Sequence, residues 1–244
     1  MNEAFLKTMV ALVAGLVSFL LFATLLFRRI DRVMPVFVAY IGLYIAEGLG
    51  SAAAIRYMQP EYPAVYLASC TLDLFFAVAV LIEAGGNVLR SNHLPTDGWI
   101  KRPAMLFGGS SLLLWPMLRW SNPPRLPAIF WIDLSMTRAD TIFSVTAILA
   151  LLVWSSALKL RWPERELRVV TGMSLMALIS FAVLLFYVNG KVGHQYYWLD
   201  LLTPLTCVLV FLYWLFYFGL DAGATAVIGN DHKTLPHQRT TAAQ

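Results

Sequence analysis

The chain has 244 residues, of which 59% are apolar and only 13% are charged, and its formal net charge at pH 7 is +4. So many apolar residues with so few charges cannot be arranged around one soluble core, and the surplus must face lipid. An ordinary soluble globular protein is therefore excluded. Any activity must reside within a membrane domain or at its two faces.

The apolar residues fall into seven stretches, separated by connections too short to form domains of their own. A span needs roughly 20 mostly apolar residues at ~1.5 Å per residue, and a helix satisfies its own backbone within lipid. The predicted helices cover residues 8–27, 33–55, 62–88, 103–118, 127–158, 169–188 and 196–220. This pattern predicts an all-α, polytopic bundle of seven transmembrane spans over residues 1–220, followed by a disordered cytoplasmic tail, 221–244.

The distribution of lysine and arginine predicts the orientation, because both are enriched in short cytoplasmic loops. One side of the predicted bundle carries twelve of these residues: Arg28, Arg29, Arg32, Arg90, Lys101, Arg102, Lys159, Arg161, Arg165, Arg168, Lys233 and Arg239. The other side carries five: Lys7, Arg56, Arg119, Arg125 and Lys191. The N-terminus is therefore expected outside and the C-terminus inside.

Several functional classes lack the residues that they need. Cys70 and Cys207 both fall inside predicted helices, where lone thiols usually pack as small apolar groups. All four histidines fall in predicted loops or the tail, so no intramembrane imidazole pair can ligate haem. Phosphate loops, dinucleotide fingerprints and nucleophile elbows are also missing. We therefore predict no cofactor and no metal. The basic clusters beside lipid do not favour a nucleic-acid partner either.

Charged side chains inside the predicted helices are the informative feature, because each costs ~2.5–3.5 kcal/mol at the bilayer centre. Glu83 falls near the inner end of its helix, where water and Arg90 are expected to reach it. The charges in the first half of stretch 127–158 indicate that this part lies outside the hydrocarbon or is irregular. Five acids and one arginine from four predicted helices converge on the outer half: Glu47, Asp73, Asp133, Arg138, Asp140 and Asp200.

These charged residues belong to polar stripes, because positions three, four and seven apart share one helix face. The stripes are Tyr40, Tyr44, Glu47 and Ser51; Tyr66, Ser69, Cys70 and Asp73; Asp133, Thr137, Asp140 and Ser144; and Asp200, Thr203 and Cys207. They predict a polar interior open to the outside. Three interpretations remain: mutual satisfaction as interhelical contacts, with Arg138 paired to acids; a site for a small cation or amine; or catalysis.

The three functional classes differ in what they require. A small transporter usually shows internal repeats, and the first and last three predicted helices share no motif. An intramembrane enzyme would need a carboxylate acid/base pair, such as Asp73 with Glu47 or Asp140, but no nucleophile accompanies them. A ligand-sensing or accessory subunit fits the topology and would need a protein partner on the basic cytoplasmic face. The sequence favours this last, non-enzymatic role, and no catalytic residue is assigned.

Some short motifs resemble a family of uncharacterised bacterial seven-helix integral membrane proteins. They are Arg28-Arg29-Ile30, residues 34–40, an acid in the middle of the third predicted helix, Leu81-Ile82-Glu83, Thr137-Arg138, Trp162 and Thr171-Gly172. The resemblance implies a multi-pass protein of the bacterial inner membrane and carries no known activity. It assigns no functional residue.

The predicted orientation can be tested with reporters fused to each end of the chain. We expect a reporter after Gln244 to read cytoplasmic and one before Met1 to read external, because the basic residues favour that side. Reporter activity in intact cells measures both, and each fusion is the control for the other. An external C-terminus would contradict seven spans and would leave six or eight.

Overall fold

The computed structural model describes residues 3–57, 62–95, 101, 128–188 and 197–220, and within these ranges the chain is entirely helical, without strands. The elements are α1 (Glu3–Phe27), the short 3₁₀ turn η1 (Ile30–Arg32), α2 (Pro35–Tyr57), α3 (Tyr62–Ser91), α5 (Ala128–Ala157), α6 (Glu164–Val188) and α7 (Tyr197–Leu220). The predicted all-α fold class is confirmed. The predicted fourth helix, 103–118, and the tail, 221–244, lie outside the described residues.

The sequence left two possibilities for the charged first half of stretch 127–158, a position outside the hydrocarbon or an irregular backbone. The segment 128–157 is one continuous α-helix, so its backbone is not irregular, and its apolar stretch covers Thr141–Ala157. Helix α6 begins at Glu164 rather than at residue 169. Glu164 and Glu166 lie in its first turn, where negative charge interacts favourably with the positive end of the helix dipole.

Five of the described helices are long and apolar enough to cross a membrane. These segments are Thr8–Phe27, Pro35–Ala53, Leu67–Ser91, Glu164–Phe186 and Leu201–Gly219, and α5 adds a shorter apolar stretch, Thr141–Ala157. Large apolar side chains remain exposed on the outside of the bundle, among them Phe19, Leu49, Phe75 and Phe216. Such a surface suits lipid and not water. The protein is a multi-pass membrane protein.

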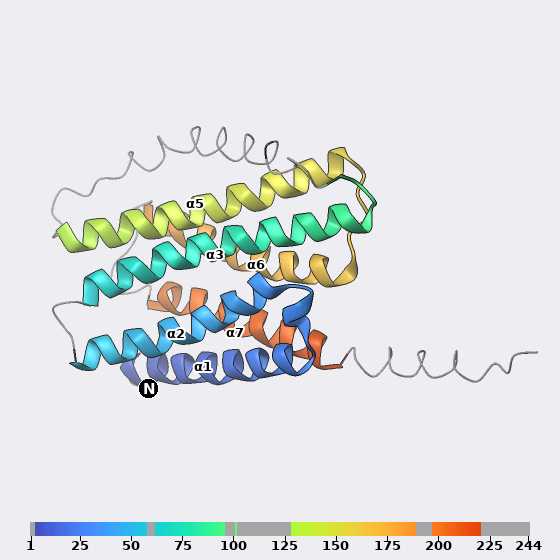
Figure 1. Ribbon diagram of the computed structural model, residues 1–244. Helices are drawn as coiled ribbons and strands as arrows, with labels where there is room; N and C mark the ends of the chain where they lie inside the picture. Colours follow the sequence, from blue (N-terminus) through green and yellow to red (C-terminus); the bar gives the residue numbers. More distant parts are fainter. Residues whose placement is uncertain (1–2, 58–61, 96–100, 102–127, 189–196, 221–244) are drawn as a thin grey trace, which may run out of the picture.

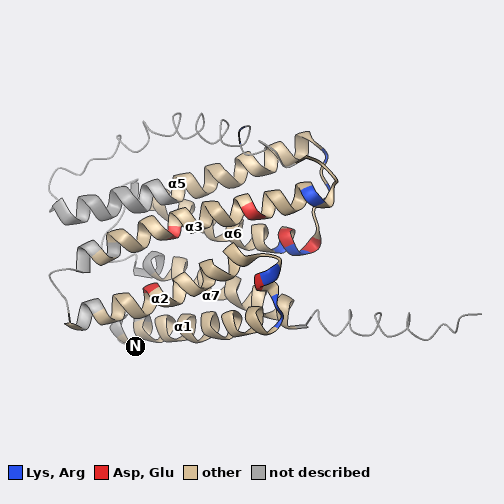
Figure 2. Cartoon of the chain, viewed as in Figure 1, with Lys and Arg blue, Asp and Glu red and all other residues tan. Residues whose placement is uncertain are grey.

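The described helices lie side by side and form a ring, in which α1 packs on α2, α2 on α3, α3 on α5, α5 on α6, α6 on α7 and α7 on α1 (Figure 1). Lysine and arginine residues gather at one end of this ring (Figure 2). We call it the basic end and define it by Arg28, Arg29, Arg32, Arg90, Lys159, Arg161, Arg165 and Arg168. The connections after α1, α3 and α5 all reach it.

Side-chain hydrogen bonds to backbone tie the helix ends together at the basic end. Arg28 Nη2 donates to the Gly219 carbonyl at 2.8 Å, which joins the end of α1 to the end of α7. Asn92 donates to the Arg161 carbonyl at 2.8 Å and accepts from the Arg161 amide at 3.1 Å. The second pair joins the end of α3 to the connection between α5 and α6.

An aromatic cluster packs between α2 and α7. Phe37, Phe211 and Trp214 are fully buried, and the Trp214 ring lies 5.0 Å from Phe37 and 5.8 Å from Phe211, centroid to centroid. Tyr44 continues the column, with its ring 4.8 Å from Phe211 in an edge-to-face contact. We call these four residues the aromatic core. Offset and edge-to-face pairs of this kind add to the energy of burial.

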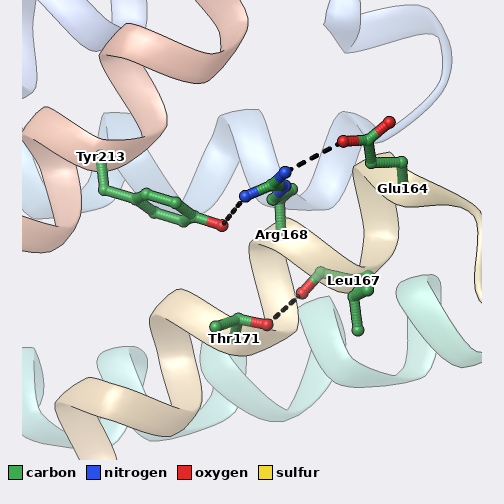
Figure 3. Close-up of polar contacts among 5 residues, drawn as sticks. All are labelled: Glu164, Leu167, Arg168, Thr171 and Tyr213. Atoms are coloured by element: carbon green, nitrogen blue, oxygen red, sulfur yellow. Dashed lines mark hydrogen bonds and ion pairs between the residues drawn. The ribbon is translucent and has the colours of Figure 1, made fainter.

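Trp214 also fixes the spacing of α6 and α7. Its indole lies over Gly172, where an added Cβ would come within 2.6 Å of ring atoms, and its Nε1 donates to the Arg168 carbonyl at 3.1 Å. Figure 3 shows the Arg168 side chain between Glu164, at 3.0 Å, and the Tyr213 hydroxyl, at 3.4 Å. The ion pair is exposed and contributes little, so the buried indole sets the distance between the helices.

Gly172→Ala should therefore destabilise the protein by about 1–3 kcal/mol, because the new methyl group must displace a buried indole ring. Thermal unfolding in detergent measures the change. Gly15→Ala in α1 is the matched control, since an added Cβ there has no neighbour within 4 Å, and it should be neutral or slightly stabilising. Equal melting of the two variants would show that the Gly172 contact does not set the α6–α7 distance.

Candidate functional site

A cavity of about 320 Å³ lies within the ring and is lined by α2, α3, α5, α6 and α7. Its polar lining comprises Tyr40, Tyr44, Glu47, Asp73, Thr141, Ser144, Ser180, Thr203 and Cys207. Its apolar lining comprises Ala77, Val78, Leu81, Ile148, Met173, Met176, Ala177 and Pro204. Two carboxyl groups and no lysine or arginine are therefore found among the described lining residues.

The structure brings together two of the six predicted site residues, Glu47 from α2 and Asp73 from α3. The other four are Asp133, Arg138, Asp140 and Asp200, and their side chains lie outside what the structure describes. Members of the same predicted stripes do reach the cavity, namely Ser144 from α5 and Thr203 and Cys207 from α7. The predicted polar interior is thus found on the described parts of four helices.

Helix α6 contributes a wall that the sequence reasoning missed. Met173, Met176, Ala177 and Ser180 all line the cavity, and their spacing places them on one face of the helix. Ser180 is the polar member of that face. The helical spacing of these residues was available as a signal in the sequence. The face that they form contains no charged residue, however, and so resembles an ordinary apolar helix face.

A carboxylate outside the cavity holds the two acid-bearing helices in position. Glu83 of α3 accepts hydrogen bonds from the amides of Val36 and Phe37, both at 3.0 Å, one to each carboxylate oxygen. These amides belong to the first turn of α2, and amides in the first turn of a helix have no carbonyl acceptor within that helix. The sequence predicted that water and Arg90 would reach Glu83. Arg90 does interact with it electrostatically, but the first turn of α2 is its direct partner.

This anchor sets the depth of both cavity acids. Helices α2 and α3 run antiparallel, because the start of α2 lies beside the last third of α3. At ~1.5 Å per residue, Glu47 lies about 16 Å along α2 from Val36, and Asp73 lies about 15 Å back along α3 from Glu83. The two carboxyl groups therefore reach the cavity at nearly the same level.

Tyrosine hydroxyls connect the acids to the rest of the lining. Tyr40 is a hydrogen-bond partner of Asp73, and Tyr44 is a hydrogen-bond partner of the buried Cys207 thiol. Tyr44 also lies close to both Asp73 and Glu47. Since a tyrosine ring offers a face as well as a hydroxyl, these two residues can contact a cation in either way.

On the side of the basic end, the cavity ends at two rings of the aromatic core, Phe37 and Phe211. On α2 the lining runs from Glu47 to Tyr40, and Phe37 follows one turn closer to the basic end. On α7 it runs from Thr203 to Cys207, and Phe211 follows one turn later. The fully buried rings of Phe37 and Phe211 separate the cavity from the basic end. On α2 and α7 the described lining therefore stops short of the basic end.

The α7 wall carries a backbone irregularity. Pro204 lies inside the helix and lines the cavity, and a proline has no amide to donate to the carbonyl four residues earlier. The carbonyl of residue 200 therefore lacks its usual donor within the helix. Thr203 beside it is exposed, whereas Cys207 is buried, so this wall runs from the surface inward.

The chemistry of the lining favours a cation with an apolar body. Two carboxyl groups and several hydroxyls accept hydrogen bonds from an ammonium group, and methionine and aliphatic side chains contact hydrocarbon. Among the described residues no group of three acidic, histidine or cysteine side chains could hold a metal ion. The described lining also offers no serine–histidine or cysteine–histidine pair for covalent catalysis. The described groups can hold a ligand by charge, hydrogen bonds and apolar contact.

No protein-family model matches the chain, and no similar characterised protein or solved structure was found. The function is therefore inferred from the cavity.

The Glu83 anchor predicts a large and specific loss of stability. Glu83→Ala leaves two α2 amides without acceptors and should destabilise the protein by about 1–3 kcal/mol, whereas Glu83→Gln retains one acceptor and should lose less. Thermal unfolding in detergent measures both. Glu164→Ala, which removes a glutamate exposed at 64%, should melt close to the parent. If Glu83→Ala melts like Glu164→Ala, the first turn of α2 does not need Glu83.

Proposed function

We propose that this protein is a ligand-sensing or accessory membrane subunit, without enzymatic activity, that binds a small organic cation in the cavity. One observation carries the proposal: Glu47 and Asp73 face the same cavity from two helices, beside hydroxyl and methionine side chains. Two carboxyl groups in one cavity attract a positive charge, and a protonated amine would supply one.

The volume of the cavity limits the size of this ligand. Ligand pockets usually measure roughly 300–1,000 Å³, so a cavity of about 320 Å³ lies at the small end of that range. It would hold roughly ten waters at ~30 Å³ each. A short amine or a quaternary ammonium compound fits, with its charge near Glu47 and Asp73 and its carbon atoms against Met173 and Met176.

The proposed topology gives the ligand its side of entry. With seven spans, the N-terminus outside and the C-terminus inside, the basic end would lie in the cytoplasm. The cavity lies beyond the aromatic core from that end, so the ligand would enter from outside. In a bacterial inner membrane that side is the periplasm. The basic end would then be the surface on which a protein partner transmits the signal.

The packing favours binding over the two alternatives. A small transporter must open its site alternately to both sides of the membrane. Here the fully buried rings of Phe37, Phe211 and Trp214 lie between the cavity and the basic end. An intramembrane enzyme could use Glu47 and Asp73 as an acid/base pair, but the described lining supplies no nucleophile or metal set. The described residues thus favour a binding pocket over a transport path or a catalytic site.

Thermal shift with a panel of small amines and quaternary ammonium salts tests the proposal. The parent should gain stability, by about 2.7 kcal/mol at a ligand concentration one hundred times Kd. Asp73→Asn should abolish this gain and nearly preserve the unliganded fold, because the amide keeps the shape and much of the hydrogen bonding. Asp31→Asn is the matched control, since this acid is exposed outside the cavity, and it should respond like the parent.

Two results would contradict the proposal. If no compound stabilises the parent while Asp73→Asn melts markedly lower, the acids are interhelical contacts and not a binding site. If Asp31→Asn loses the response as fully as Asp73→Asn does, the compounds bind by general charge and not in the cavity.

A further inference from the structure

A second hollow, separate from the central cavity, lies between α2 and α3 at the basic end. It measures about 490 Å³, and its polar lining consists of Arg32, Glu83, Asn87 and Arg90. Its remaining lining is apolar, with Val33, Pro35 and Val36 on one side and Ala79, Ile82 and Gly86 on the other. We call it the α2–α3 groove. It has no part in the proposed amine site.

Two of the four polar side chains of the groove make hydrogen bonds to the backbone of the protein, and the other two are exposed. Both Glu83 oxygens accept from α2 amides, and the Asn87 side chain donates to the Val33 carbonyl at 3.3 Å. Arg32 and Arg90 are exposed, and within the described part of the chain neither forms an ion pair. The groove therefore presents two guanidinium groups, while its single carboxylate is occupied by the backbone.

The apolar walls extend the groove along the lipid-facing surface. Val33 and Ile82 are 44% and 38% exposed, and both line the groove beside the arginines. The groove lies where α2 begins and α3 ends, which is where two candidate membrane spans reach the basic end. A ligand seated there would place an anion against Arg32 and Arg90 and hydrocarbon against Ile82.

We propose that the α2–α3 groove binds an anionic phospholipid of the surrounding bilayer, with its phosphate held by Arg32 and Arg90 and an acyl chain lying along Ile82 and Val33. Guanidinium groups match phosphate oxygens in charge and geometry, and basic pockets between transmembrane helices bind anionic headgroups on the cytoplasmic side. A free phosphate would leave the apolar walls without a partner, so the complete groove fits a lipid better.

The test uses the full chain, purified in a neutral detergent and titrated with phosphatidylglycerol or with phosphatidylcholine of the same acyl chains. Native mass spectrometry counts bound lipid, and thermal unfolding measures the stabilisation. Phosphatidylglycerol should bind more tightly than phosphatidylcholine. Arg32→Gln and Arg90→Gln should each weaken its binding by about fivefold, as expected for the loss of one cation near the membrane surface.

Arg165→Gln is the matched control, because Arg165 is an exposed arginine at the same end that does not line the groove. It should bind phosphatidylglycerol like the parent. Arg32 makes no described ion pair, so Arg32→Gln is informative even if Arg90→Gln lowers stability by removing a charge near Glu83. Inorganic phosphate, added in a separate arm, should stabilise the protein far less than the lipid.

Three results would overturn the proposal. Equal binding of the two lipids would show that the headgroup charge is not recognised. An equal loss in Arg165→Gln would show that the basic end attracts lipid without a site. Equal stabilisation by inorganic phosphate would make the groove a site for a free anion. None of these results bears on the amine site, which the Asp73→Asn comparison tests separately.

Discussion

The pairing of Glu83 with the first turn of α2 is the contact on which the functional part of the molecule depends. A helix start in a membrane must have its amides satisfied, and here a neighbouring helix supplies both acceptors at 3.0 Å. The contact fixes α2 against α3 along their axes. A slip of one turn, about 5.4 Å, would move Glu47 and Asp73 to different levels. The same carboxylate lines the α2–α3 groove, so both hollows depend on it.

The bundle is closely packed with apolar side chains near the basic end and has a polar interior farther along its axis. Near the basic end the aromatic core and the Gly172–Trp214 contact supply dense apolar packing. Beyond it, two carboxyl groups and several hydroxyls line an open volume that contributes much less to stability. A polar cavity at that depth is costly, and the packed half offsets the cost. Because the two zones share α2 and α7, the core holds the cavity walls in place without filling the cavity.

The sequence predicts features that depend on one helix and misses those that depend on two. Apolar length located the six described helices, and helical spacing assigned Glu47, Asp73, Ser144, Thr203 and Cys207 to polar faces that meet in the cavity. The direct partner of Glu83 could not be predicted, because nothing in α3 indicates which backbone lies beside it. The ends of three helices were also hard to predict from the sequence. The residues that follow α1, α3 and α5 in left-handed conformation are Arg29, His93 and Lys159, and not the glycine that usually marks a helix end.

The two sides of the cavity differ in how firmly they are held. On one side, α2 and α3 are locked by the two Glu83 hydrogen bonds and by Asn87. On the other, α7 contains Pro204, which removes one hydrogen bond from the helix at the level of the cavity. Pro204 therefore leaves α7 one backbone hydrogen bond short at the level of the cavity, and a helix bends most easily at such a point. The other end of α7 is tied to the end of α1 by Arg28, so the helix is held at the basic end and weakened at the level of the cavity.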